Sequence, residues 1–170
     1  MKSSGLENVI EAADLLRDEP LIFAIVGQGG GKARLERMVQ QRGLRNMQFF
    51  PLQSYDALPA LLKMGDCHLV VQKRGAADAV LPSKLTNILA VGGNAVITAR
   101  SPHRTGTRLL TSKPFRALRF ALNRNRSRRW WRAIRQALLL PEHNTVAREY
   151  AERTLDKENV LRQFINDIRG

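Results

Sequence analysis

Two short segments of this chain have the residue types that bind phosphate groups in proteins. The first is Gly27-Gln28-Gly29-Gly30-Gly31-Lys32, which follows an apolar run and precedes an amphipathic stretch. Glycines between a strand and a helix let backbone N–H groups approach a phosphate, and the helix N-terminus adds favourable partial charge. The segment is no Walker loop, because Ala33 stands where Ser or Thr would hold Mg²⁺. An ordinary strand-to-helix turn is the alternative that these residues leave open.

The second segment is Leu81-Pro82-Ser83-Lys84-Leu85, at the start of an expected helix. Pro82 fixes the direction of the chain, Ser83 can cap the helix, and Lys84 would lie in its first turn. A cation is unfavourable at a helix N-terminus unless an anion is bound there too, so this pattern predicts a phosphate near Ser83 and Lys84. The alternative is a lysine whose head group is simply solvated.

Other residues with reactive side chains are better explained as structural ones. We interpret Cys67 as a small core residue at the start of a strand, and His68 as a structural or exposed histidine without a triad or metal partner. Tyr55-Asp56 is interpreted as a capped turn before a helix. The single cysteine excludes an internal disulfide and fits a reducing cytoplasm. With only three scattered histidines, we expect no metal site and no catalytic residue assignable in this chain.

The elements that would position these segments alternate along the chain. Apolar runs predict strands over residues 21–26, 47–52, 67–71 and 95–98, and helical spacing predicts helices over 5–17, 32–42, 56–64, 84–91, 134–140, 144–153 and after Asp156. This order indicates an α/β fold, a Rossmann-like doubly wound parallel sheet with helices on both faces. The continuous apolar run 21–26 predicts a strand buried on both faces. Ligands of such sheets bind at the carboxyl ends of the strands.

The size and hydropathy of the chain exclude some classes of protein. Its 170 residues correspond to one domain, or to one domain with a fragment of another. No apolar run reaches the ~18 residues that a membrane-spanning helix needs, and the first residues lack the apolar core of a signal peptide. We therefore expect a cytoplasmic protein.

The positive charge is concentrated in one part of the sequence. The net charge is +13, yet residues 100–135 contain twelve Lys or Arg and no acid, which leaves 16 basic and 15 acidic residues elsewhere. The same part contains Trp130 and Trp131. It could bind nucleic acid, with phosphates neutralised by arginine and bases stacked on tryptophan. It could instead lie on a membrane surface. A third alternative is a stretch read in the wrong frame.

The layout of the remaining sequence resembles the C-terminal donor domain of GT-B glycosyltransferases of the retaining family 4. The similarity covers residues 5–99 and 134–170. It is carried by the order and spacing of several motifs: Gly5-Leu6 with Ala12, Phe23 to Gly29, Leu44 to Phe50, Leu58 to Leu62 with Gly65-Asp66, Leu81 to Leu85, and Ala90 to Ile97. Within the family, the pattern is most similar to enzymes of bacterial exopolysaccharide synthesis.

This resemblance implies a donor site for a nucleotide sugar, either a GDP- or a UDP-sugar, and no further cofactor. It puts the diphosphate near Gly27 and Gly29 and near Ser83 and Lys84. It puts the base or ribose near Leu52 and Gln53, with Asn87 at the second position of a glutamate pair common in the family. The family's acceptor, expected here to be a lipid-linked oligosaccharide, is bound by an N-terminal domain that this chain lacks.

The resemblance also implies a fragment that is inactive alone, and a location that is cytoplasmic or peripheral on the inner membrane. Of the three alternatives for residues 100–133, we favour the wrong reading frame. With codons chosen to allow it, one added base turns Arg116 to Ala133 into P-G-I-A-V-C-V-E-P-E-S-V-E-A-L-V-A-G, the strand, turn and helix that the family pattern requires. The other frame turns residues 100–107 into a sequence containing E-A-H-T-E-L-G. We therefore expect an irregular basic insert that lies on the surface as a loop or an exposed helix, and no specific nucleic-acid binding.

Overall fold

The computed structural model of the protein describes residues 5–71, 83–99, 118–121 and 127–169. The described strands are β1 (Phe23–Val26), β2 (Met47–Phe50), β3 (His68–Val70), β4 (Ala95–Ala99) and β5 (Leu118–Ala121). The described helices are α1 (Glu7–Leu15), α2 (Lys32–Gln41), α3 (Leu58–Lys63), α4 (Ser83–Ala90), α6 (Ser127–Leu138), α7 (Thr145–Thr154) and α8 (Lys157–Arg169).

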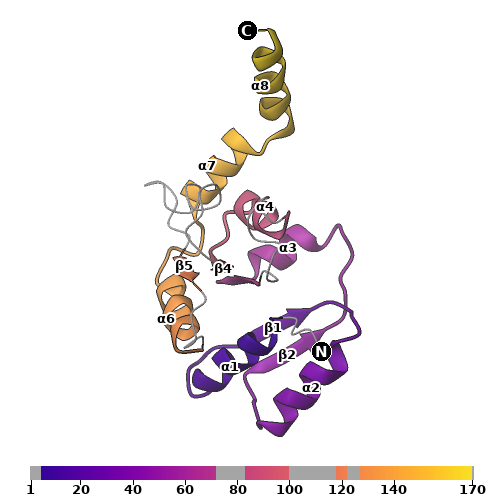
Figure 1. Ribbon diagram of the computed structural model, residues 1–170, viewed down its shortest axis with the longest axis vertical. Coiled ribbons are helices and arrows are strands. Elements are labelled where there is room, and N and C mark those ends of the chain that lie inside the picture. The colour runs from indigo at the N-terminus through magenta and orange to yellow at the C-terminus, as the bar shows by residue number, and fades with distance from the viewer. Residues whose placement is uncertain (1–4, 72–82, 100–117, 122–126, 170) are drawn as a thin grey trace.

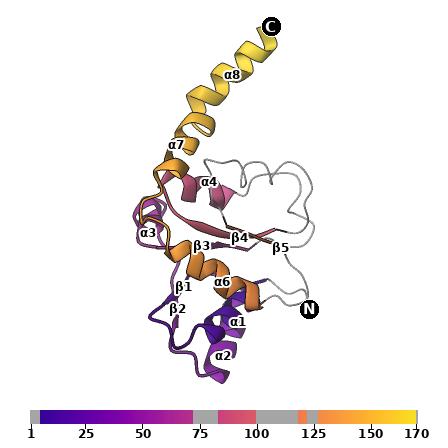
Figure 2. The same cartoon turned by 90° about the vertical axis from the view of Figure 1, so that its left-hand side faces the viewer.

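The strands are parallel, as predicted, but they form two sheets rather than one. β1 pairs with β2, with Phe23 opposite Met47. β4 lies between β3 and β5, with His68 opposite Ala95 and Val96 opposite Leu118. Figures 1 and 2 show the two-stranded sheet below the three-stranded one, with α3 on the connection between them.

Helices pack on both faces of the three-stranded sheet. Side chains alternate between the faces of a strand, and in β4 Val96 belongs to one core while Ala95 and Ile97 belong to the other. The Val96 core includes α1 and α6, and the other core includes α4 and α7. This arrangement confirms the predicted layering around β3 and β4.

The two-stranded sheet differs from the prediction in its burial. Phe23 is buried with Leu35 and Val39 of α2, but Ala24 is exposed and Ile22 is 66% exposed. The expectation that residues 21–26 are buried on both faces is therefore wrong. The reason is that the two-stranded sheet is covered mainly from the side of α1 and α2.

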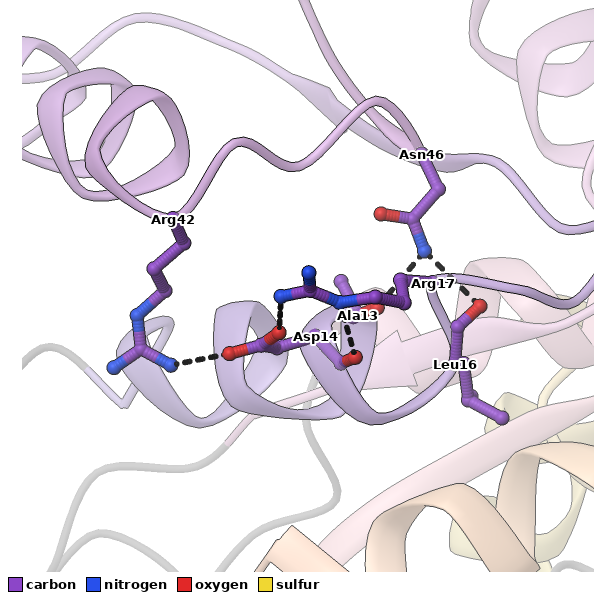
Figure 3. A network of polar contacts seen from close by, with 6 residues as sticks. All are labelled: Ala13, Asp14, Leu16, Arg17, Arg42 and Asn46. Atoms are coloured by element: carbon purple, nitrogen blue, oxygen red, sulfur yellow. Dashed lines mark hydrogen bonds and ion pairs between the residues drawn. The ribbon is translucent and has the colours of Figure 1, made fainter.

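A buried asparagine fixes the end of α1. The Asn46 Nδ2 group donates to the carbonyl oxygens of Ala13, at 2.9 Å, and Leu16, at 3.2 Å (Figure 3). The Ala13 carbonyl oxygen also accepts the Leu16 N–H at 3.2 Å, and the Leu16 carbonyl oxygen accepts the Glu19 N–H at 3.1 Å, so Asn46 adds a second donor to each carbonyl at the end of the helix. Beside them, the Asp14 carboxylate accepts hydrogen bonds from Arg17 and from Arg42, the residue that follows α2. Arg17 and, to a smaller extent, Arg42 hold the pKa of Asp14 below its usual value.

The basic segment contains regular structure. Residues 118–121 form β5 at the edge of the sheet, and α6 begins at Ser127, seven residues before the helix that we predicted from residue 134. The expectation of a loop or an exposed helix is therefore wrong over β5, whereas residues 127–133 are helical; residues 100–117 and 122–126 lie outside the described part. Helix α6 forms because Ala133, Ile134 and Ala137 face the core while Arg132 and Arg135 remain exposed, so no charge has to be buried.

The last two helices begin at side-chain caps. Asn144 Oδ1 accepts a hydrogen bond from the Ala147 N–H at 3.0 Å, and Asp156 caps α8, as predicted, through the Asn159 N–H at 3.1 Å. Helix α8 points away from the sheets (Figures 1 and 2). Its apolar side chains Val160, Leu161, Ile165 and Ile168 are exposed. None of the helices in the described part has the length and hydropathy to cross a membrane.

Candidate functional site

The glycine-rich segment lies at the carboxyl end of β1, where the sequence predicted it. Gly27 has φ +144°, a conformation that favours glycine, and its N–H group donates to the Phe50 carbonyl oxygen at 3.1 Å. A Cβ atom added at Gly27, Gly29, Gly30 or Gly31 would meet no other atom within 4 Å. The loop is therefore open to solvent, and helix α2 begins directly after it without a side-chain cap.

Leu52 and Gln53 lie at the same edge of the two-stranded sheet as Gly27. They follow β2, whose last residue, Phe50, is hydrogen-bonded to Gly27. Leu52 is 66% exposed, and the Gln53 Nε2 group donates to the Pro51 carbonyl oxygen at 2.9 Å. The structure thus brings these two predicted base-contacting residues and the glycine-rich loop to one edge.

Ser83, Lys84 and Asn87 lie on one exposed face of α4. Residues three and four apart share a face of a helix, and all three side chains are exposed, whereas Leu85, Ile88 and Leu89 are buried on the opposite side. The Ser83 carbonyl oxygen accepts a hydrogen bond from the Thr86 hydroxyl at 2.7 Å. Pro82, which precedes the helix, lies outside the described residues.

The predicted site residues therefore form two groups. Gly27, Gly29, Leu52 and Gln53 lie on the two-stranded sheet, and Ser83, Lys84 and Asn87 lie on α4, which packs on the three-stranded sheet. Helix α3 follows the first group in the chain and contacts α4. The joint use of both groups by one ligand stays a prediction.

Cys67 and His68 have the structural roles that we expected. The Cys67 thiol is partly buried against the core, and burial, with Asp66 nearby, raises its pKa to about 12. It is therefore a protonated thiol at neutral pH, not a nucleophile. The His68 Nε2 atom is 2.8 Å from the Leu62 carbonyl oxygen, and burial lowers the pKa of this ring. The part of the chain that the structure describes contains no cluster of three His, Cys, Asp or Glu side chains suited to a metal.

The turn before α3 was predicted only in part. The Ala57 and Leu58 N–H groups donate to the Ser54 and Tyr55 carbonyl oxygens, so the turn is present. Helix α3 has Ala57 at its N-cap and no side-chain cap, so the expected capping by Asp56 is wrong.

The described basic residues of α6 are partly neutralised. The guanidinium groups of Arg132 and Arg135 lie 5.5 and 5.0 Å from the centre of the Trp131 ring, within the range of cation–π attraction. Arg135 also pairs with Glu19, which follows α1. The contacts with Trp131 lie within α6, and the pair with Glu19 joins α6 to the segment after α1.

Sequence reasoning missed two buried or capping asparagines, Asn94 and Asn144, that join α4 to α7. Asn94 follows a pair of glycines and Asn144 precedes a helix. The second position carries an N-cap signal, but no sequence signal pairs two residues fifty positions apart.

Comparison with known proteins identifies the class of protein that this fold and site define. Residues 2–154 match the model of the family described as glycosyl transferases group 1. This chain belongs to that family. A curated relative from Escherichia coli K12, named as a colanic acid biosynthesis glycosyl transferase, WcaI, is 78% identical over 169 residues. The aligned part is 99% of this chain and 41% of WcaI, so the chain spans about two fifths of its curated relative.

Two solved structures share the fold of this chain. HepE of Anabaena, solved in complex with UDP-glucose, superposes with a TM-score of 0.70 at 15% identity, over 97% of this chain and 45% of its own. WaaG, a glycosyltransferase involved in lipopolysaccharide biosynthesis, superposes with a TM-score of 0.62 at 19% identity, over 96% of this chain and 43% of its own. The α/β fold with parallel strands is thus that of the GT-B glycosyltransferases.

Proposed function

We propose that this chain is the donor-binding part of a glycosyltransferase that takes a sugar from a nucleotide sugar for colanic acid synthesis. The observation that carries this proposal is the 78% identity to WcaI along 99% of the chain. The complex of HepE with UDP-glucose supports a nucleotide sugar as the donor. The nucleotide is GDP or UDP.

The exposed groups at the two sheets are suited to different parts of the donor. In this proposal the diphosphate is bound by backbone N–H groups near Gly27 and Gly29 and by Ser83 and Lys84. Leu52, Gln53 and Asn87 contact the base or ribose. Transfer retains the configuration of the sugar, and the diphosphate leaves from the face that the acceptor attacks. Its negative charge is stabilised by Lys84 and by the N–H groups near Gly29.

The acceptor in this proposal is a lipid-linked oligosaccharide bound by an N-terminal domain. This division of labour is supported by the length of WcaI, of which the matched part is 41%. The enzyme works in the cytoplasm, at the surface of the inner membrane, where a lipid-linked acceptor is available. Binding to nucleic acid plays no part in this function.

Binding of a nucleoside diphosphate tests the donor site directly. UDP and GDP are titrated calorimetrically into the chain and into its Lys84→Ala variant. A charge-assisted contact to phosphate corresponds to roughly 1.5–3 kcal/mol, so the variant should bind roughly ten- to a hundredfold more weakly. Lys157→Ala is the matched control, because Lys157 is an exposed lysine at the start of α8, remote from α4. Equal binding by the parent chain and Lys84→Ala would refute the assignment.

A further inference from the structure

A glycine turn at the end of α4 brings this helix close to the start of α7. The Gly92 and Gly93 N–H groups donate to the Leu89 and Ile88 carbonyl oxygens, both at 2.9 Å, and Gly92 has φ +73°. These bonds form a Schellman motif, which ends a helix at a residue in the left-handed conformation. A Cβ atom at Gly92 would lie 2.5 Å from the His143 ring. Glycine at this position therefore permits the close approach of residues 143 and 144.

Two asparagines hold the chain segments together at this point. The Asn144 N–H donates to the Gly92 carbonyl oxygen at 2.8 Å, and the Asn144 Nδ2 group donates to Asn94 Oδ1 at 3.1 Å. The Asn94 Nδ2 group in turn donates to the Pro141 carbonyl oxygen at 2.9 Å. Asn94 is only 2% exposed, so water cannot replace a partner that is lost. We call Asn94 and Asn144, with these bonds, the asparagine latch.

Helix α7 packs along the buried face of α4 beside the latch. Ala147 and Ala151 are buried in one core with Leu85, Ile88 and Leu89. Small alanine side chains let the two helices approach closely. Arg148 of α7 also donates a hydrogen bond to the Ala90 carbonyl oxygen, at the last residue of α4. A cation at the C-terminus of a helix is favourable.

We propose that the asparagine latch positions α4 so that Lys84 and Ser83 meet the diphosphate of the donor. Asn94 and Asn144 are positioning residues, which act through α4 and touch no ligand. The buried face of α4 packs against α7, the latch holds the turn that follows α4, and the opposite face of the helix presents Ser83, Lys84 and Asn87. A small rotation of this eight-residue helix about its anchored end would displace the lysine. This inference rests on the proposed donor site.

The variant Asn144→Ser removes the side-chain bond to Asn94 but keeps the N-cap of α7. Serine is as good an N-cap as asparagine, so it can still accept the Ala147 N–H, but it lacks the Nδ2 group that reaches Asn94. Asn159→Ser is the control, because it removes an asparagine Nδ2 group that donates to the Glu152 carbonyl oxygen and has no link to α4. All chains are compared at a temperature at which each is fully folded by circular dichroism.

The experiment measures UDP and GDP affinity for the parent, Asn144→Ser, Lys84→Ala and the double variant. Loss of one hydrogen bond should weaken binding by roughly three- to tenfold in Asn144→Ser, and not in Asn159→Ser. Because the latch acts through Lys84 as well as Ser83, Asn144→Ser should weaken binding by a smaller factor once Lys84 is replaced than it does in the parent. Fully additive effects in the double variant, or unchanged affinity in Asn144→Ser, would overturn the inference but leave the donor site standing. A parent chain that binds neither nucleotide would overturn both.

Hydrogen exchange tests the mechanical part of the inference without any ligand. The amides of α4 should exchange faster in Asn144→Ser than in the parent, while those of α2 should not change. Equal protection of α4 in both chains would show that the latch does not hold this helix.

Discussion

Asn46 offers a sensitive test of how this domain is held together. Its side chain is 7% exposed, and its Nδ2 group satisfies the Ala13 and Leu16 carbonyl oxygens at the end of α1 (Figure 3). Its own Oδ1 atom is buried and has no hydrogen-bond partner among the described residues. Asn46→Ala removes the two hydrogen bonds that Nδ2 donates and also the unsatisfied Oδ1 atom. Asn46→Asp removes the same two bonds and adds a second buried oxygen facing two carbonyls.

The two variants should therefore differ in magnitude and in pH dependence. Asn46→Ala should lower the free energy of unfolding by about 1–2 kcal/mol, because it loses two hydrogen bonds of about 1 kcal/mol each and gains a little from removal of the unsatisfied oxygen. Asn46→Asp should lose about 3 kcal/mol or more at pH 7, because a carboxylate is then buried without a donor. Burial raises the pKa of the introduced carboxyl in the folded state above the unfolded value of about 3.9. The folded state then binds more protons, so the stability of Asn46→Asp should fall as pH rises through this window.

Urea unfolding at pH 5 and pH 8, followed by circular dichroism, measures these differences. Asn166→Asp is the control, because Asn166 is exposed on α8, and it should change the free energy of unfolding by about 0.5 kcal/mol or less at either pH. The reasoning fails if Asn46→Asp is as stable as Asn46→Ala at pH 8, or if its loss of stability is the same at both pH values.

Three further outcomes are expected. The chain alone should transfer no sugar from GDP- or UDP-sugars in a radiolabel assay. Catalysis needs donor and acceptor held together, which lowers the activation barrier by up to roughly 11 kcal/mol. Measurable transfer by the purified chain would contradict this prediction. A repaired chain has P-G-I-A-V-C-V-E-P-E-S-V-E-A-L-V-A-G in place of Arg116 to Ala133 and a segment containing E-A-H-T-E-L-G in place of residues 100–107. It should be more stable than the original chain in urea unfolding, and it should lose the salt-sensitive retention of oligonucleotides on filters. A less stable repaired chain, or a preference of the original for one nucleic-acid sequence well above ~10³-fold, would reject the reading-frame interpretation. Asp14→Asn should lower the free energy of unfolding by up to about 1 kcal/mol at pH 7 and by less at pH 3. The reason is that a carboxyl with a lowered pKa stabilises the fold only while it is ionised. An equal loss of stability at both pH values would contradict a contribution from the ion pairs.

The order of the elements and their chemistry could be predicted from the sequence. Periods of two and 3.6 residues depend on near neighbours in the chain, and they predicted β1 to β4 and the helices, apart from the start of α6, within a few residues at their ends. The glycine-rich segment and the Ser83-Lys84 segment were likewise found from residue type and position, and both lie exposed on the elements expected. Strand β5 and the first seven residues of α6, both in the basic segment, were missed. Their charge concealed the alternation in Leu118 to Ala121 and the apolar face of α6.

The sequence by itself determined the family, the alternation of strands and helices, and the residues available to bind a donor. Only the tertiary structure decided that the strands divide into two sheets, that Asn46 completes the end of α1, and that Asn94 meets Asn144 beside Gly92. The physical reason is the range of the interactions. Helical and strand patterns are fixed by residues a few positions apart, whereas a hydrogen bond between residues 94 and 144 exists only after α4, β4 and α7 have packed around a common core.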